Sequence, residues 1–179
     1  MNLWHDVPLG DNAPQEFNAI VEIPKESHNK YEIDKETSLI KLDRANYNAA
    51  PYPCEYAFAP QTLAEDGDAM DVLILTTFPI YPGILVTVRP VALMEMTDTG
   101  ETDNKVIAVP VEDRRWDDVK DLADLNKHTL REFKLFFETI KQLKEKPAIV
   151  TVHGFKDREA ALAEIKGTRE VYKKKFSVK

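Results

Sequence analysis

The sequence contains a single cysteine, Cys54, among 179 residues. One thiol cannot form an internal disulfide, and without a second cysteine there is no zinc-ribbon pattern. The chain also lacks any run of 18 or more apolar residues, and its first residues are too polar for the apolar stretch of a secretory signal. These absences argue against disulfide-rich and membrane-spanning proteins. Size and composition predict one cytoplasmic domain over residues 1–179.

Several common functional motifs are also missing. The sequence has no Walker A loop, GxGxxG, GxSxG or HExxH, and its four histidines show no metal-ligand spacing. Acidic residues outnumber basic ones, 31 against 24, which gives a formal charge of −7 and argues against a nucleic-acid partner. The carboxylate excess is compatible with bound divalent cations, although solubility explains it equally well.

Short segments of alternating apolar residues dominate the first two thirds of the chain and predict strands. They are NAIVEI, KYEI, SLIKL, VLIL and ILVTV, followed by 92–96, 106–111 and 148–152. The pieces between Tyr31 and Leu42 flank a polar stretch and predict a hairpin whose turn lies in 34–38. The spacing of the strands predicts a small antiparallel barrel.

Two segments in the C-terminal half change to helical periodicity. The first places Leu130, Phe133, Phe137, Ile140 and Leu143 on one face, and the second does the same for Leu162, Ile165, Tyr172 and Phe176. Asn126 and Asp157 are the expected N-caps, and Pro147 is expected to end the first helix. The fold class is therefore α+β, with two amphipathic helices packed on the barrel.

The densest acidic segment is EDGDAMD, residues 65–71. Asp66 and Asp68 are two residues apart, Gly67 between them permits a left-handed backbone, and Asp71 can join them at the start of the next strand. Crowded carboxylates are costly unless a cation lies between them, and oxygen-only ligands favour Mg²⁺, Mn²⁺ or Ca²⁺ over zinc. A polar turn explains this loop alone equally well.

A second acidic segment, MTDTGETD, places Asp98, Glu101 and Asp103 around a turn at Gly100. Neither acidic loop is an EF-hand, because the sixth and twelfth positions counted from Asp66 are Asp and Thr. The two loops together favour a catalytic or substrate-bridged Mg²⁺ site. Such a site also needs cations and hydroxyls for phosphate oxygens, and the upstream candidates are Lys30, Glu32, Arg44, Tyr52 and Tyr56, although each alone is more typical of a surface or packing residue.

These motifs, in this order, resemble the family I soluble inorganic pyrophosphatases of bacteria and archaea. The resemblance extends over nearly the whole chain and rests on VEIPKESHNKYEID, the Asp43 and Arg44 pair, YPCEYAFAPQTL, the DGDxxD core of EDGDAMDVLIL, PGILVTVRPVALMEMTDTGETDNKVIAVP and FFETIK. It implies an oligonucleotide-binding-like (OB-like) barrel with flanking helices. It also implies hydrolysis of pyrophosphate to two phosphates with Mg²⁺, or alternatively Mn²⁺, in a homo-oligomer, expected to be a hexamer.

The resemblance also implies residue roles. Asp66, Asp71 and Asp103 hold one metal ion, and Asp71 is also a ligand of a second. Asp98 and Asp103 bind metal that arrives with the substrate. Asp68 accepts a proton from the attacking water, and a metal-activated water of this kind needs no covalent intermediate. The residues implied to contact phosphate oxygens are Lys30, Arg44, Tyr56, Lys105 and Lys141, and the acids implied at the edge of the metal–water network are Glu22 and Glu32.

Three positions depart from the family pattern. Ala57 stands where Gly is usual, which is mild unless its φ is positive. Glu55 replaces a usual Asn and is expected to face solvent or to pair with a cation. Ile140 stands where a phosphate-binding Tyr is expected, although it also fits the apolar stripe of the first helix.

Two other functions compete with this interpretation. A different Mg²⁺-dependent phosphohydrolase, acting on nucleotides or polyphosphate, needs the same acids and cations, but no nucleoside-binding motif is present. A barrel with a decayed site that serves only as an interaction module conflicts with the intact aspartates and, for nucleic acid, with the negative charge. Phe136 and Phe137 are adjacent in the first helix, which leaves two alternatives. Either one ring lies off the core stripe and is available for a subunit contact in an oligomer, or both rings are buried in the same core.

Overall fold

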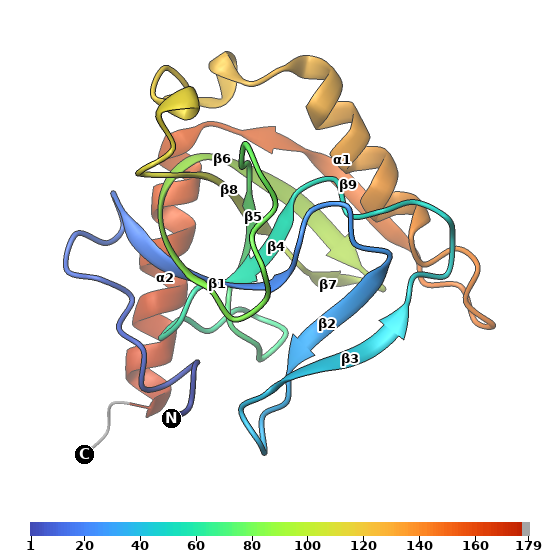
Figure 1. The fold of residues 1–179 in the computed structure, drawn as a ribbon, viewed down its shortest axis with the longest axis horizontal. Helices are drawn as coiled ribbons and strands as arrows, with labels where there is room; N and C mark the ends of the chain where they lie inside the picture. Colours follow the sequence, from blue (N-terminus) through green and yellow to red (C-terminus); the bar gives the residue numbers. More distant parts are fainter. Residues whose placement is uncertain (177–179) are drawn as a thin grey trace.

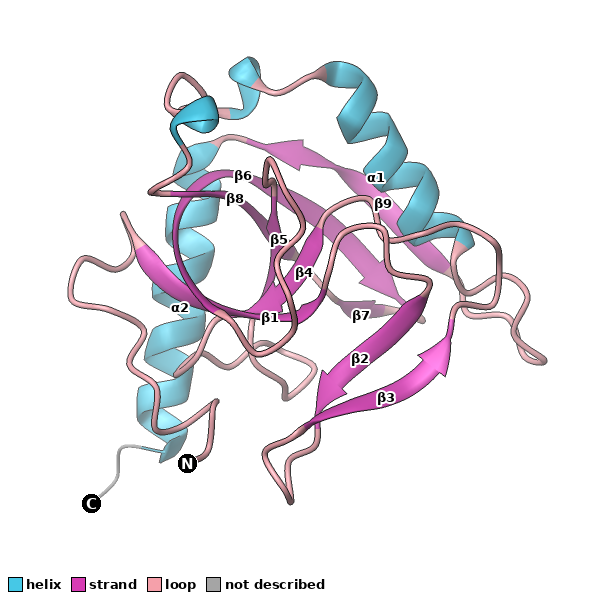
Figure 2. Ribbon diagram, in the orientation of Figure 1, coloured by secondary structure: helices cyan, strands magenta, loops and turns pink. Residues whose placement is uncertain are grey.

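The computed structural model describes residues 1–176 (Figures 1 and 2). The strands are β1 (Phe17–Ile23), β2 (Asn29–Ile33), β3 (Ile40–Ala45), β4 (Glu55–Phe58), β5 (Asp71–Ile74), β6 (Leu85–Asp98), β7 (Glu101–Thr102), β8 (Lys105–Pro110) and β9 (Val150–Lys156). The helices are α1 (Lys127–Thr139) and α2 (Arg158–Phe176), with 3₁₀ turns η1 (Arg114–Trp116) and η2 (Leu122–Asp124). The α+β class is confirmed.

Five strands pair in a closed circuit that matches an OB-like barrel. β1 pairs with β4 and β6, β4 with β5, β5 with β8, and β8 with β6. Four of these pairings are antiparallel, but β5–β8 is parallel, so the prediction of an entirely antiparallel barrel is wrong for this pair. Five strands in a closed circuit cannot alternate in direction all the way round, so one pairing must be parallel, and here it is β5–β8.

β6 joins two predicted strands into one. The predicted segments 84–88 and 92–96 are connected through Pro90, and the register with β8 shifts between Pro90 and Ala92. A proline cannot donate to the ladder and is tolerated at such an irregularity. The long β6 can therefore pair with β1 and β8, and near its end with β9 and β7.

The two helices cover different parts of the barrel, as Figure 2 shows. Phe133, Phe136 and Phe137 of α1 pack in one apolar cluster, and Ala161 and Ile165 of α2 pack in another. β8 has all six residues buried, because it is covered on both faces. Apolar burial of this kind is the main stabilising term of the fold.

Helix α1 begins as predicted and ends earlier. The Asn126 side chain accepts a hydrogen bond from the His128 N–H at 2.8 Å, which caps the first turn. The last helical residue is Thr139, and Leu143 lies beyond it with 69% of its surface exposed, so the predicted end near Pro147 is wrong. After Leu143 the segment KEKP, residues 144–147, is charged and ends in proline. Phe136 and Phe137 are both buried, so neither ring is free for a subunit contact.

Helix α2 follows its prediction closely. Asp157 accepts the Ala160 N–H at 3.0 Å, and Leu162, Ile165 and Tyr172 are buried on the side that faces the barrel. Phe176 lies on the same face, with its ring 4.9 Å from that of Tyr172, although 42% of its surface is exposed. No helix among residues 1–176 is long and apolar enough to cross a membrane.

Strands β2 and β3 form the predicted hairpin as a separate two-stranded sheet. Ile33 pairs with Ile40, and the turn between them lies in the predicted residues 34–38. Figure 1 shows this hairpin projecting from the barrel.

Candidate active site

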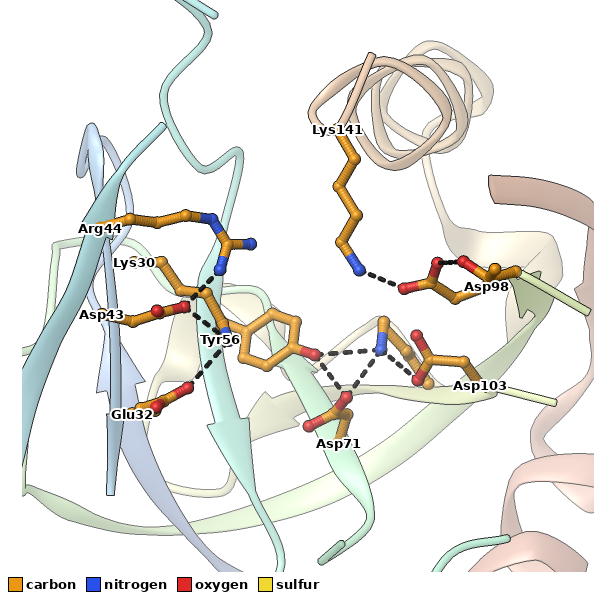
Figure 3. Close-up of polar contacts among 11 residues, drawn as sticks. Lys30, Glu32, Asp43, Arg44, Tyr56, Asp71, Asp98, Asp103 and Lys141 are labelled. Atoms are coloured by element: carbon orange, nitrogen blue, oxygen red, sulfur yellow. Dashed lines mark hydrogen bonds and ion pairs between the residues drawn. The ribbon is translucent and has the colours of Figure 1, made fainter. Parts of the chain in front are cut away.

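A cavity of about 910 Å³ lies between the open end of the barrel, hairpin β2–β3 and the end of α1. Every site residue implied by the sequence lines it: Glu22, Lys30, Glu32, Arg44, Tyr56, Asp66, Asp68, Asp71, Asp98, Asp103, Lys105 and Lys141. Figure 3 shows many of these side chains pointing toward one another from separate elements. The fold therefore brings the predicted residues together, while their individual roles stay predictions.

The first acidic loop is a tight turn. Gly67 has φ +89°, the left-handed conformation that the sequence predicted, and Asp66 Oδ1 accepts the Asp68 N–H at 3.0 Å. Partial burial raises the pKa of Asp66, and the charges of Asp71 and Asp68 add to this effect. The turn therefore concentrates negative charge at the mouth of β5.

A buried lysine joins the two acidic loops. The parallel register pairs Asp71 with Lys105, the first residues of β5 and β8. Lys105 Nζ lies 2.6 Å from Asp71 Oδ2, 2.8 Å from Asp103 Oδ1 and 3.0 Å from the Tyr56 hydroxyl, which itself donates to Asp71. Burial disfavours the charge on Lys105, but Asp71 and Asp103 overcome this and raise its pKa. The ammonium group is therefore fixed and charged.

The second acidic loop is the two-residue turn between β6 and β7. Thr99 and Gly100 both have positive φ, as a type I′ hairpin requires, so Asp98 and Asp103 are held on either side of the turn. Burial raises the pKa of Asp103, with a further contribution from Asp71. Lys141, just past α1, forms an ion pair with Asp98, which lowers the pKa of Asp98 despite its partial burial.

The hairpin supplies cations to the facing wall of the cavity. Lys30 Nζ lies 3.0 Å from Glu32 and 3.1 Å from Asp43, and Arg44 forms an ion pair with Asp43 as well. Asp43 thus holds two cations that the sequence implied for phosphate, and it received no role from the sequence. The signal was present in the sequence, because Asp43 stands directly before Arg44.

Glu22 of β1 contacts the end of β2 that leads into the hairpin turn. Its carboxylate accepts the Ile33 N–H at 2.8 Å. Burial raises the pKa of Glu22 to about 8, aided by the charge of Asp71 and opposed by the Ile33 hydrogen bond. Glu22 therefore shares the electrostatic environment of the acidic loops.

The three departures from the family pattern have different outcomes. Ala57 lies within β4, paired with Val21 and Val72, and is absent from the positive-φ residues, so the mild interpretation applies. The expectation for Glu55 is wrong, because its side chain is buried away from the cavity and accepts hydrogen bonds from the Thr76 hydroxyl at 2.6 Å and the Ile80 N–H at 3.0 Å. Ile140 is buried in the core with Phe136 and also lines the cavity.

The family follows from comparison with known proteins. The family model described as inorganic pyrophosphatase matches residues 19–173. The chain belongs to the inorganic pyrophosphatase family. It is 44% identical over 177 residues to the inorganic pyrophosphatase of Haloferax volcanii, and this match covers 99% of both chains. The inorganic pyrophosphatase of Thermus thermophilus is 45% identical over 168 residues, covering 93% of this chain and 96% of that one.

The fold agrees with the same family. The crystal structure of the Thermus thermophilus inorganic pyrophosphatase superposes with a TM-score of 0.94 at 44% identity, covering 97% of this chain and 99% of that one. The resemblance drawn from the sequence motifs is thereby confirmed.

The donor set of the cavity fits an oxygen-liganded divalent cation. The described residues contain no ready group of three His, Cys, Asp or Glu at metal-binding spacing. Lys105 lies between Asp71 and Asp103 and satisfies both carboxylates. Burial raises the pKa values of Asp66 and Asp103, and the negative charge of Asp71 adds to both. A divalent cation relieves this repulsion as Lys105 does, with twice the charge.

Proposed function

We propose that the chain hydrolyses inorganic pyrophosphate to two phosphates in this cavity, with Mg²⁺ as its metal. Membership of the family makes it an inorganic diphosphatase, a hydrolase of phosphoric anhydrides. The observation that carries the proposal is the convergence of Asp66, Asp71 and Asp103 on one wall of a cavity whose facing wall presents Lys30 and Arg44. A small, highly charged anion that brings its own metal suits this arrangement of acids opposite cations.

Asp66, Asp71 and Asp103 would hold the resident metal, and Asp98 with Asp103 would receive metal that accompanies the substrate. Mg²⁺, when bound, lowers the pKa of a coordinated water and neutralises charge on the transferred phosphoryl group. Mn²⁺ takes the same oxygen ligands and is the alternative. The metal ligands come from both acidic loops.

Asp68 would orient the attacking water and accept its proton. Its carboxylate lies at the exposed end of the acidic turn, within the cavity and next to Asp66. The water oxygen forms a bond to one phosphorus while the bridging P–O bond breaks. The water proton goes to Asp68, and the leaving phosphate takes a proton from solvent.

The cations would stabilise the charge that shifts to the leaving phosphate. Lys105 and Tyr56 approach from the barrel, Lys30 and Arg44 from the hairpin, and Lys141 from the end of α1. Glu22 and Glu32 would lie at the edge of the metal–water network. Each cation already has a carboxylate partner that fixes its side chain, for example Asp43 for Arg44 and Asp98 for Lys141.

The direct test is phosphate release from pyrophosphate, ATP and tripolyphosphate, each with Mg²⁺ and with chelator. The proposal expects release from pyrophosphate with Mg²⁺ and none with chelator. Preferential release from ATP or tripolyphosphate would identify another phosphohydrolase. No release from any substrate, with the fold intact by circular dichroism, would indicate an interaction module.

The homo-oligomer and the cytoplasmic location belong to the proposal. Four of the large apolar side chains that face solvent lie together on and beside the loop between β5 and β6, which favours a subunit contact there; they are Phe78, Tyr81, Ile84 and Leu85. A hexamer is the expected assembly. Light scattering that returns a mass near 20.4 kDa at micromolar concentration would refute an oligomer.

A further inference from the structure

The tip of hairpin β2–β3 contacts the acidic loop through one residue that no assigned role covers. Lys35 Nζ forms an ion pair with Asp68 Oδ1 and lies 5.6 Å from the centre of the Trp4 ring. Lys35, Trp4 and Asp68 all line the active-site cavity. The residue proposed to take the proton from water is therefore in contact with a cation carried by a projecting arm.

The rest of the tip is self-contained. Asp34 accepts hydrogen bonds from the Glu36 N–H at 3.2 Å and from the Thr37 hydroxyl at 3.0 Å. Directly before the turn, the N–H of Ile33, the last residue of β2, donates to Glu22, so this end of the strand is held and only 34–38 can move. Within the described chain, no hydrogen bond or ion pair other than that of Lys35 connects 34–38 to a residue outside the hairpin. Lys35 is thus the polar attachment of the tip.

Trp4 provides a fixed surface for this lysine. Its indole N–H donates to the Thr62 carbonyl at 2.8 Å, and its ring stacks on His5 with centroids 4.6 Å apart. His5 in turn contacts the Tyr172 hydroxyl at 2.7 Å, so the N-terminal segment is attached to α2. Because Trp4 is anchored to the barrel and to α2, a movement of the tip must separate Lys35 from it.

The contact between Lys35 and Asp68 is weak enough for another cation to replace the lysine. The side chains are 66% and 58% exposed, and an exposed ion pair of this kind is weak and easily replaced. Asp66 accepts the Asp68 N–H, so Asp68 belongs to the same negative turn that the proposed function assigns to a divalent cation. An ammonium group and a divalent cation at the same acidic turn would repel each other, and they would compete for the same negative potential.

We propose that Lys35 is a latch: it holds the hairpin tip on Asp68 and Trp4, and it leaves both when the acidic loop takes up a divalent cation. Lys35 is then a positioning residue, because it acts through Asp68 and not on the substrate. Release of the tip frees the Asp68 carboxylate for the attacking water and widens the mouth of the cavity. This inference rests on the proposed function for the role of Asp68, but the movement itself is measurable without substrate.

The movement is tested by ¹⁹F NMR of protein labelled with fluorotryptophan, in which Trp4→Phe assigns the Trp4 resonance. In chelator-treated wild type, addition of Mg²⁺ is expected to shift the Trp4 resonance as Lys35 leaves the ring. Lys35→Gln is expected to show the shifted position before Mg²⁺ is added and to respond little afterwards. Lys41→Gln, which removes the same charge from the same hairpin at an exposed position, should behave as wild type. An equal Mg²⁺ response in wild type and Lys35→Gln would overturn the latch.

Direct titration calorimetry gives a second readout that does not depend on activity. Because the lysine competes with the metal, Lys35→Gln should bind Mg²⁺ about two- to fivefold more tightly than wild type. Lys35→Arg should bind Mg²⁺ as wild type does, and Lys41→Gln should show at most a minor gain. Equal gains in the two Gln variants would mean that only the net charge matters and would refute the latch. Wild-type pyrophosphate hydrolysis, measured in parallel, tests the proposed function separately.

Discussion

The two walls of the cavity are built on different principles. On the barrel wall, Asp71, Asp103 and Lys105 lie at the ends of paired strands, and the Lys105 side chain is only 2% exposed. On the hairpin wall, Lys30, Glu32 and Arg44 lie on an isolated two-stranded sheet with side chains that are 25–44% exposed. The first wall is part of the barrel and is largely desolvated, whereas the second is partly solvated and belongs to the hairpin that projects from the barrel.

This contrast gives the two walls different tasks: catalysis depends on the barrel wall, and substrate binding depends on the hairpin wall. Desolvation makes each uncompensated charge on the barrel wall costly, so its acids and its lysine are strongly coupled, and loss of one member disturbs all. Water screens the hairpin charges, so each contributes separately and less. Substitutions on the barrel wall should therefore abolish chemistry, and those on the hairpin should weaken substrate binding.

The largest expected effect is on the barrel wall. Asp71→Ala should lower kcat more than about a thousandfold at saturating Mg²⁺, because it removes a metal ligand and leaves Lys105 buried without one of its partners. Glu65→Ala, an exposed neighbour outside the cavity lining, should stay within about twofold of wild type. Steady-state phosphate release measures both. Similar activity of Asp71→Ala and wild type would contradict the metal assignment.

The hairpin wall should respond less strongly. Arg44→Ala is expected to raise KM for pyrophosphate about tenfold to a hundredfold, the range for one hydrogen bond to a charged group, with a smaller change in kcat. Arg114→Ala is the control, because its side chain is 87% exposed in a 3₁₀ turn outside the cavity. If Arg44→Ala lowered kcat as much as Asp71→Ala does and left KM unchanged, the distinction between the two walls would be refuted.

Ile140 lies where the end of α1 meets the cavity. If a tyrosine hydroxyl there donates to a phosphate oxygen, Ile140→Tyr should raise kcat/KM by about tenfold. The larger ring in the core beside Phe136 should also lower the free energy of unfolding by about 1–3 kcal/mol. Ile140→Val, measured in parallel, separates a packing effect from a hydroxyl effect. A lower Tm without a gain in kcat/KM would assign the position to the core alone.

The smallest effect concerns Glu22, at the junction of the two walls. Its pKa of about 8 in the folded protein lies above the ordinary value of 4.5, so the folded state keeps this proton while the unfolded chain loses it. Stability from this group is therefore lost as pH rises through that window. Glu22→Gln, which fixes the neutral form, should raise Tm by about 2–4 °C relative to wild type near pH 8.5 and by less near pH 5, both in chelator. A Tm difference that does not change with pH would show that Glu22 is not protonated in this way.

Local features of the site could be predicted from the sequence because they depend on neighbouring residues. Gly67 and Gly100 mark turns with left-handed backbone, and Asn126 and Asp157 cap the two helices. The orientation of Glu55 could also have been predicted, because strand neighbours point to opposite faces and Tyr56 points into the cavity. The family resemblance, now confirmed, supplied the residue set that lines the cavity.

Long-range arrangements could not be predicted from residue patterns. The parallel pairing of β5 with β8 depends on strand order, and it alone places Lys105 beside Asp71. The Lys35 contact with Asp68 depends on the length and curvature of the hairpin, which no local pattern records. The early end of α1 leaves Leu143 of the predicted apolar stripe exposed, which periodicity alone did not indicate. The single-domain and residue-role predictions stay predictions.

The central claim is that the barrel wall holds the metal while Asp68 takes the proton. Asp68→Asn keeps the shape and one oxygen of the side chain but cannot accept the proton, so it separates the two tasks. The decisive measurement pairs Mg²⁺ affinity by calorimetry with kcat for pyrophosphate in this one variant. The account predicts an affinity within about fivefold of wild type together with a kcat lowered about a hundredfold or more. A parallel loss of metal binding and turnover, or a kcat that is unchanged, would contradict it.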